Sequence, residues 1–379
     1  MTHRSAALAT LVGSILIGGV ALAVLTVTDP QPALGLGLPD AGAITRWGLP
    51  VARGVRDLSA AATIGLLFVV AVLLPDDARA RPRLAEARAR GITAATIGAG
   101  VWAIASAAVL VLTYSDTAGI PVLEPSLWST MPTYLRSVEL GQANLIGTAM
   151  ITAVAVGCLV ARKVDGTEVA VLLGSLAALW PIATTGHAST DANHQQSVLL
   201  LFSHLVAVSI WFGGLAAFGF LQDQIGRYRH AVLRRYSVTA TCCLALVALS
   251  GVVSAMLRLG SWSALSSPYG AVIAAKATLL LVLGAVGFLH CRPLVDKTPT
   301  WTARARRRFT ALAGVELLVM CVAVALGIAL GRTPPPDPDP SPATTRHLVD
   351  RSQGATSEQR RAAPWCGRPS GPPPILHSR

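Results

Sequence analysis

The sequence is poor in charge and in aromatic side chains. Only 13% of its 379 residues are charged and 5% are aromatic, whereas 53% are hydrophobic and the mean hydropathy is +0.56. A soluble chain of this length needs far more polar surface, so this composition excludes an ordinary soluble globular protein. Most of the apolar residues are small or aliphatic, which suits close helix packing in lipid. We therefore predict an integral membrane protein of the plasma membrane, in contact with the lipid bilayer.

Several motifs of catalysis and redox chemistry are absent. The six cysteines form no CxxC pair, because Cys242 and Cys243 are adjacent and the others are isolated. A redox motif or a structural zinc site is therefore not expected. The sequence contains no GxxxxGK[ST] loop, and spacing places no nucleophile beside a base. We predict that the protein is not an enzyme and that ATP does not drive it directly.

Long apolar runs supply the fold prediction. A helix needs about 20 apolar residues to cross a bilayer. Nine runs meet or approach this length: 7–28, 54–74, 91–113, 141–161, 168–185, 198–220, 238–258, 270–290 and 309–331. The fifth run is short and contains Trp180-Pro181, so we expect it to be kinked or tilted. The predicted fold is all-α, a polytopic transmembrane bundle of about nine helices.

Basic residues predict the orientation of these helices. The net charge of +12 comes from Lys and Arg that cluster in every second loop, whereas residues 186–197 and 259–269 contain neither. Cytoplasmic loops of membrane proteins carry the excess of Lys and Arg. The N-terminus is therefore predicted to be cytoplasmic, and the charge indicates topology rather than binding to nucleic acid.

The chain divides into three predicted parts. Residues 1–190 hold helices one to five, residues 198–331 hold helices six to nine, and residues 332–379 form a tail rich in Pro and Arg. The tail has no apolar period, so we expect it to be disordered. Its abrupt change in composition leads us to interpret it as a non-native ending.

Three histidines are close together near the predicted outer surface. Two lie in the polar break after the fifth run, beside Asp191, and the third lies inside the sixth run; they are His187, His194 and His204. Neutral imidazole suits copper and zinc, and thioether sulfur suits reduced copper. Met256 and Met131 are possible sulfur ligands from the same side. We predict a metal site at this outer mouth, against the alternative that the histidines only form hydrogen bonds with water or a neighbouring helix.

Other polar residues fall inside the predicted helices. Lys276 lies about as deep from the outer surface as His204, and Glu316 lies nearer the cytoplasmic end of its run; intramembrane ionisable residues often mark a pathway. Trp211 follows His204 by two helical turns. The small residues Ser209, Gly213 and Ala217 predict a packing ridge, and Arg56-Asp57 predicts a local pair at the interface.

Two segments resemble a known family. They are "HLVAVSIWFGGL" (204–215) and residues 236–294, which contain Ser250-Gly251, the turn Arg258-Leu259-Gly260-Ser261-Trp262, Tyr269-Gly270 and Lys276. These features resemble the CopD copper-resistance membrane domain. Through about residue 340, the chain is also similar to the front half of actinobacterial proteins that join a CopD-like part to a CtaG-type oxidase-assembly domain. The resemblance implies copper as the bound ion, and copper uptake, transfer or resistance as the function.

Two alternatives remain at this stage. A bundle of this type could hold haem for electron transfer, although only His204 lies well inside a run. The chain could also be an assembly scaffold for a copper-containing oxidase. The expected partners are a periplasmic copper-binding protein or an oxidase-assembly protein.

Overall fold

The computed structural model describes residues 40–75, 82–185, 194–259, 268–295 and 303–330. All of them belong to one compact unit, Met1–Pro335. The first predicted run, 7–28, and the predicted tail, 332–379, lie outside the described residues. Within the described ranges every regular element is helical, which agrees with the all-α prediction.

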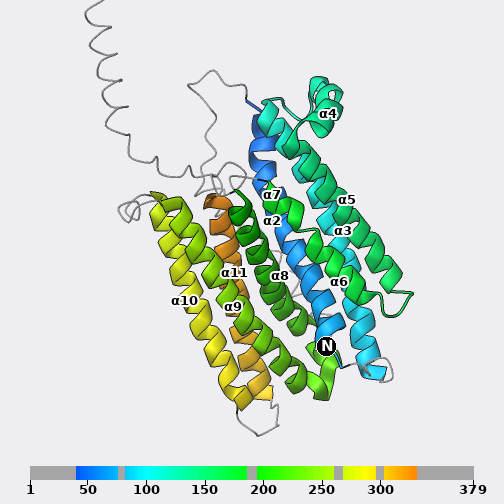
Figure 1. Cartoon of the computed structure of the whole chain (residues 1–379). Coiled ribbons are helices and arrows are strands. Elements are labelled where there is room, and N and C mark those ends of the chain that lie inside the picture. The colour runs from blue at the N-terminus through cyan, green and yellow to red at the C-terminus, as the bar shows by residue number, and fades with distance from the viewer. Residues whose placement is uncertain (1–39, 76–81, 186–193, 260–267, 296–302, 331–379) are drawn as a thin grey trace, which may run out of the picture. The chain divides into compact units, whose positions relative to one another are not determined.

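The helices follow the apolar runs closely. In chain order they are α2 (Gly42–Phe68) with the one-turn π-helix η1 (Val69–Leu73), α3 (Pro82–Ala118), α4 (Pro125–Ser137), α5 (Glu139–Ala161), α6 (Glu168–Ala177), α7 (Trp180–Thr184), α8 (His194–Ile225) with η4 (Gly226–Tyr228), α9 (Arg229–Leu259), α10 (Pro268–Val295) and α11 (Ala303–Leu330). Figure 1 shows the long helices α2, α3, α5, α8, α9, α10 and α11 packed side by side, with α4 at one end of the bundle.

Four helical stretches are long and apolar enough to cross a membrane. They are Gly42–Leu73, Pro82–Ala118, Glu139–Ala161 and Gln195–Met256, the last of which includes most of α8 and α9. Shorter apolar stretches cover Glu168–Thr184, Ile273–Gly287 and Phe309–Val324. Together they account for the second to the ninth predicted runs, and the chain is a polytopic helical membrane protein.

The fifth run is broken, as its sequence predicts. Pro181 has no backbone N–H and cannot continue the hydrogen-bond ladder of α6. The run therefore divides into α6 and the five-residue α7, in which Pro181 occupies the first turn.

α4 was not predicted. It lies between the predicted runs 91–113 and 141–161, where no helix was predicted, and it buries Leu127, Met131 and Tyr134. Tyr134 stacks on Tyr114 of α3 with ring centroids 4.3 Å apart. Met131 belongs to this aromatic cluster, so its side chain serves packing beside α3.

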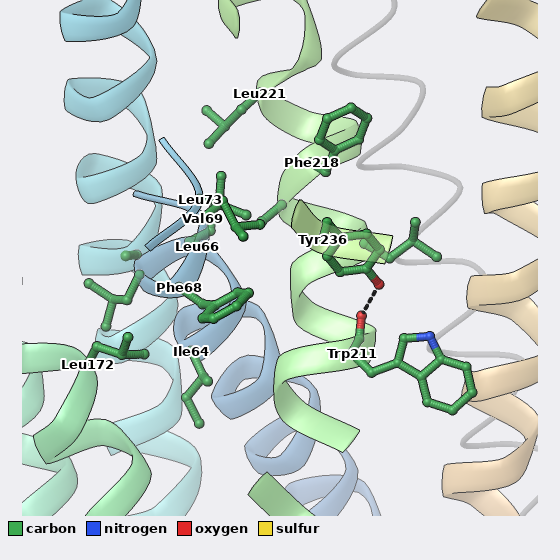
Figure 2. Packing of buried hydrophobic residues seen from close by; sticks show 14 of the residues in the cluster. Ile64, Leu66, Phe68, Val69, Leu73, Leu172, Trp211, Phe218, Leu221 and Tyr236 are labelled. Atoms are coloured by element: carbon green, nitrogen blue, oxygen red, sulfur yellow. Dashed lines mark hydrogen bonds between the residues drawn. The ribbon is translucent and has the colours of Figure 1, made fainter. Parts of the chain in front are cut away.

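The two halves of the bundle meet where α2 crosses α8. A Cβ atom built on Gly213 would lie 1.8 Å from the carbonyl oxygen of Ala61, and one built on Gly65 would lie 1.9 Å from the carbonyl carbon of Gly213. Only glycine permits this approach, because any side chain would overlap the backbone of the other helix. Buried Ile64, Phe68 and Phe218 pack around the crossing (Figure 2). The predicted ridge on α8 is thus a packing surface at Gly213.

Polar contacts join the helix ends beside the arginine-rich connections. Arg88 of α3 donates to Glu168 of α6 at 2.6 Å and pairs with Asp165 at 2.9 Å. Arg235 of α9 donates to the carbonyl oxygen of Leu73 at 3.3 Å. The connections after the second, fourth and sixth runs are therefore at the same end of the bundle. This arrangement agrees with the alternation of basic loops, while the assignment of that end to the cytoplasm stays a prediction.

Candidate metal site

His204 lies on the face of α8 that meets α9. The helix begins at His194, so His204 is about ten residues, or roughly 15 Å, along it. The predicted sixth run begins only at residue 198, so the sequence alone placed His204 about six residues, or roughly 9 Å, from its start. The imidazole is half-buried within the helical bundle. Burying this polar ring costs free energy unless specific partners form hydrogen bonds with it.

Ser250 of α9 is the hydrogen-bond partner of this imidazole. His204 Nδ1 lies 2.9 Å from Ser250 Oγ, and the serine is 1% exposed. The same hydroxyl lies 3.1 Å from the carbonyl oxygen of Val247, to which it donates. A hydroxyl has one proton, so a serine that donates to the carbonyl accepts from the ring. This assignment places the ring proton on Nδ1 and leaves the lone pair on Nε2.

A neutral imidazole held in this way has the form that binds metals. Metal-ligating histidines commonly donate one ring N–H to a protein acceptor, which fixes the tautomer and directs the other nitrogen to the ion. Ser250 supplies such an acceptor for His204. The sequence alone indicated a mid-helix Ser250-Gly251 pair but not which residue the serine contacts.

Lys276 of α10 lies close enough to His204 for its charge to act on the ring. The lysine is half-buried and eight residues into its helix, consistent with the predicted depth. A protonated Lys276 disfavours a second positive charge at His204, so it weakens the binding of a metal cation there and favours its release.

A second buried polar pair lies further along α8. The indole N–H of Trp211 donates to Glu316 Oε1 of α11 at 3.2 Å. Trp211 is 5% exposed and Glu316 is 4% exposed. Because α11 begins at Ala303 rather than near residue 309, Glu316 lies midway along its helix, deeper than the sequence predicted. The pairing was missed, since no spacing rule connects two residues 105 positions apart.

Tyr236 fixes the backbone of α8 at this level. Its hydroxyl donates to the carbonyl oxygen of Trp211 at 2.7 Å, as Figure 2 shows. Its ring is packed closely over Gly214, where a Cβ atom would lie 2.8 Å from the ring. With Gly213 against α2 on another side, the segment around Trp211 is held by both neighbours. The indole nitrogen consequently has a defined direction toward α11.

The other predicted ligands have different positions. His187 and Asp191 lie outside the described residues, and of His194 only the backbone, at the start of α8, is described. The side chain of Met256 on α9 is 61% exposed. Arg56 and Asp57 do pair, with 2.9 Å between Nη2 and Oδ1.

No three His, Cys, Asp or Glu side chains gather within the part of the chain that the structure describes.

Helices that place a histidine, a lysine and a glutamate within an apolar bundle define a class: integral membrane proteins with ionisable side chains inside their helical bundle. Two family comparisons make this more specific. Residues 230–330 match the family described as copper resistance protein D, and residues 43–196 match the copper resistance protein D-like N-terminal domain. Together the matches cover about two thirds of the sequence, and the chain belongs to the copper resistance protein D family. The predicted resemblance to CopD is confirmed, while the similarity to CtaG fusion proteins stays a prediction.

Two curated relatives are similar to parts of the chain. Copper transport protein CutJ of Bacillus subtilis is 33% identical over 119 residues, which are 29% of this chain and 22% of CutJ. Inner membrane protein YebZ of Escherichia coli is 23% identical over 242 residues, which are 59% of this chain and 80% of YebZ. The matched segment thus spans about a fifth of the length of CutJ. No solved structure matches the chain.

Proposed function

We propose that the protein handles copper at the plasma membrane, by uptake, by transfer across the bilayer or in copper resistance. The observation that carries the proposal is the contact between His204 and Ser250, which presents a neutral imidazole inside a membrane helix. Family membership and the name of the relative CutJ support copper over zinc.

His204 is the proposed inner ligand of the copper entrance. His194 and His187 precede it in the sequence, on the predicted outer side of the membrane, and are the proposed outer ligands. Copper then passes between α8, α9 and α10, beside Lys276. Met256 was a further candidate for a sulfur ligand, but its large exposure argues for a lipid-facing role, and we leave it out of the route.

The remaining alternatives have less support. A haem site needs a second imidazole opposite His204, and His230 is exposed at the start of α9. The family matches name copper resistance rather than haem or oxidase assembly. We retain a periplasmic copper-binding protein as the expected donor and a non-enzymatic role as the expectation.

Copper accumulation in cells tests this function. The variant His204→Ala combined with His187→Ala is expected to reduce accumulation and to alter copper tolerance. The matched control is His230→Ala, which removes an exposed imidazole at the opposite end of the bundle. Accumulation and tolerance equal to wild type in the double variant, with normal protein levels, would contradict the proposal.

A further inference from the structure

The carboxyl group of Glu316 is the most deeply placed acidic group among the described helices. It lies midway along α11 and is 4% exposed. The donor that holds it, Trp211, is itself fixed by the hydroxyl of Tyr236. This side chain is not needed for the entrance at His204, which lies about two turns nearer the outer surface on α8.

A charge at this depth is expensive, so it has to be compensated. Burial in an apolar medium penalises an ionised carboxylate unless a proton, a protein cation or a bound ion neutralises it. Intramembrane carboxyl groups consequently mark proton relays and ion pathways far more often than they serve packing. Trp211 suits either state of the group, because an indole only donates. A carboxyl oxygen accepts that hydrogen bond with or without its proton.

The neighbouring helices contribute few charged or titratable groups at this level. α8 contributes His204 and α10 contributes Lys276, while the charged residues of α2 come at least two turns before Gly65. On α11 itself, the basic residues belong to the first two turns. By sequence position, the other titratable and charged residues of these helices are Arg46, Arg53, Arg56 and Asp57 of α2, His194, His204 and Asp223 of α8, Tyr269, Lys276, His290, Cys291 and Arg292 of α10, and Arg304, Arg306, Arg307, Arg308 and Cys321 of α11.

We propose that Glu316, positioned by Trp211, exchanges a proton against the transported metal cation. The inference rests on the proposed copper function and deepens it, because it names the coupling ion. Entry of a monovalent cation adds one positive charge to a low-dielectric route. Release of one proton through the carboxyl group restores the balance: the O–H bond breaks, the electron pair stays on the carboxylate, and the proton leaves toward the side from which the cation enters. No electron is transferred in this step.

The test uses the full-length chain in proteoliposomes with reduced copper outside and the membrane potential clamped to zero. An interior one pH unit more acidic is expected to raise steady-state copper accumulation about tenfold for a one-for-one exchange. Alkalinisation of the lumen, followed with an internal pH dye, is expected to accompany copper entry. Glu316→Gln is expected to abolish both the tenfold effect and the alkalinisation.

Two further variants make the result specific. Glu86→Gln changes an exposed glutamate of α3 and is expected to behave as wild type. Trp211→Phe removes the donor but keeps the carboxyl group, so it is expected to slow uptake while preserving its dependence on the pH gradient. If Glu316→Gln does not fold, the wild type still decides whether uptake depends on the pH gradient, and uptake by Trp211→Phe at the wild-type rate overturns the role given to the Trp211–Glu316 pair.

The outcomes separate the two proposals. Copper uptake by wild type that ignores the pH gradient overturns proton exchange and leaves copper handling intact. Gradient dependence that survives in folded Glu316→Gln overturns the assignment to Glu316. Absence of copper uptake by wild type overturns the proposed function together with the exchange.

Discussion

His204 of α8 and Ser250 of α9 are joined by a 2.9 Å hydrogen bond across 46 positions of sequence. The serine hydroxyl is tied to its own helix through Val247, so the ring is held by a rigid element. The contact leaves Nε2 as the ring atom that can bind a metal. Removing the hydrogen bond should therefore change copper binding measurably.

Ser250→Ala is expected to weaken copper binding by about 10- to 100-fold, as loss of a partner that orients a ligating histidine commonly does. The fold should survive, because alanine fits the space of serine. Copper affinity of the purified protein, measured by competition with a chelator, checks this. Ser203→Ala is the matched control, since that hydroxyl bonds only within α8. Equal affinity in the two variants would show that Ser250 does not orient the ligand.

Gly213→Ala is expected to destabilise the bundle. The added methyl group meets the Ala61 carbonyl at 1.8 Å, and overpacking of this kind costs about 1–3 kcal/mol or more. The thermal unfolding midpoint in detergent should therefore fall. Gly219→Ala lies on the same helix, with no atom within 4 Å of the new Cβ, and should leave the midpoint unchanged or slightly raised. Equal midpoints for the two variants are incompatible with the close crossing of α2 and α8.

Arg88→Leu is expected to be strongly destabilising. The change leaves the carboxylate of Glu168, whose side chain is 6% exposed, without this guanidinium. Breaking a buried ion pair typically costs about 3–5 kcal/mol. Arg90→Leu removes a pair in which both side chains are more than half exposed, for which about 0–1 kcal/mol is expected. Unfolding by denaturant measures both. The double variant Arg88→Leu with Glu168→Leu should recover part of the loss, and a double variant no more stable than Arg88→Leu contradicts the pairing.

The orientation predicted from the basic loops can be checked by labelling. In a variant without native cysteines, Ser189→Cys should react with an impermeant thiol reagent added to intact cells. Val164→Cys, in the connection after α5, should react only after the membrane is opened. Labelling of residue 189 exclusively from the inside would contradict the proposal that the copper entrance faces outward.

The sequence predicted the helices better than their ends and contacts. Apolar runs located every spanning helix within the described ranges, since a bilayer demands about 20 apolar residues and a satisfied backbone. A predicted apolar run ends at the first charged residues, whereas the helical hydrogen bonds continue through them. α3 therefore begins at Pro82 and includes Arg88, and α11 begins at Ala303. The depths of His204 and Glu316 changed for this reason.

Most tertiary contacts could not be predicted from the sequence. α4 is short, amphipathic and contains Pro132, so neither length nor hydropathy indicated it. The sequence placed Trp211 two turns after His204, but its donation to Glu316 depends on how α8 and α11 pack. By contrast, small residues at four-residue spacing did predict a packing ridge, because only small side chains let two helices approach closely in lipid.

The metal content of the purified protein tests the central claim most directly. We predict that wild type and His230→Ala, loaded with reduced copper and washed, retain copper in a fixed stoichiometry, with nitrogen ligands visible by X-ray absorption. His204→Ala should lose that copper while keeping its helical circular dichroism spectrum. A folded His204→Ala protein that retains the same copper content and ligand signature as wild type would contradict the account.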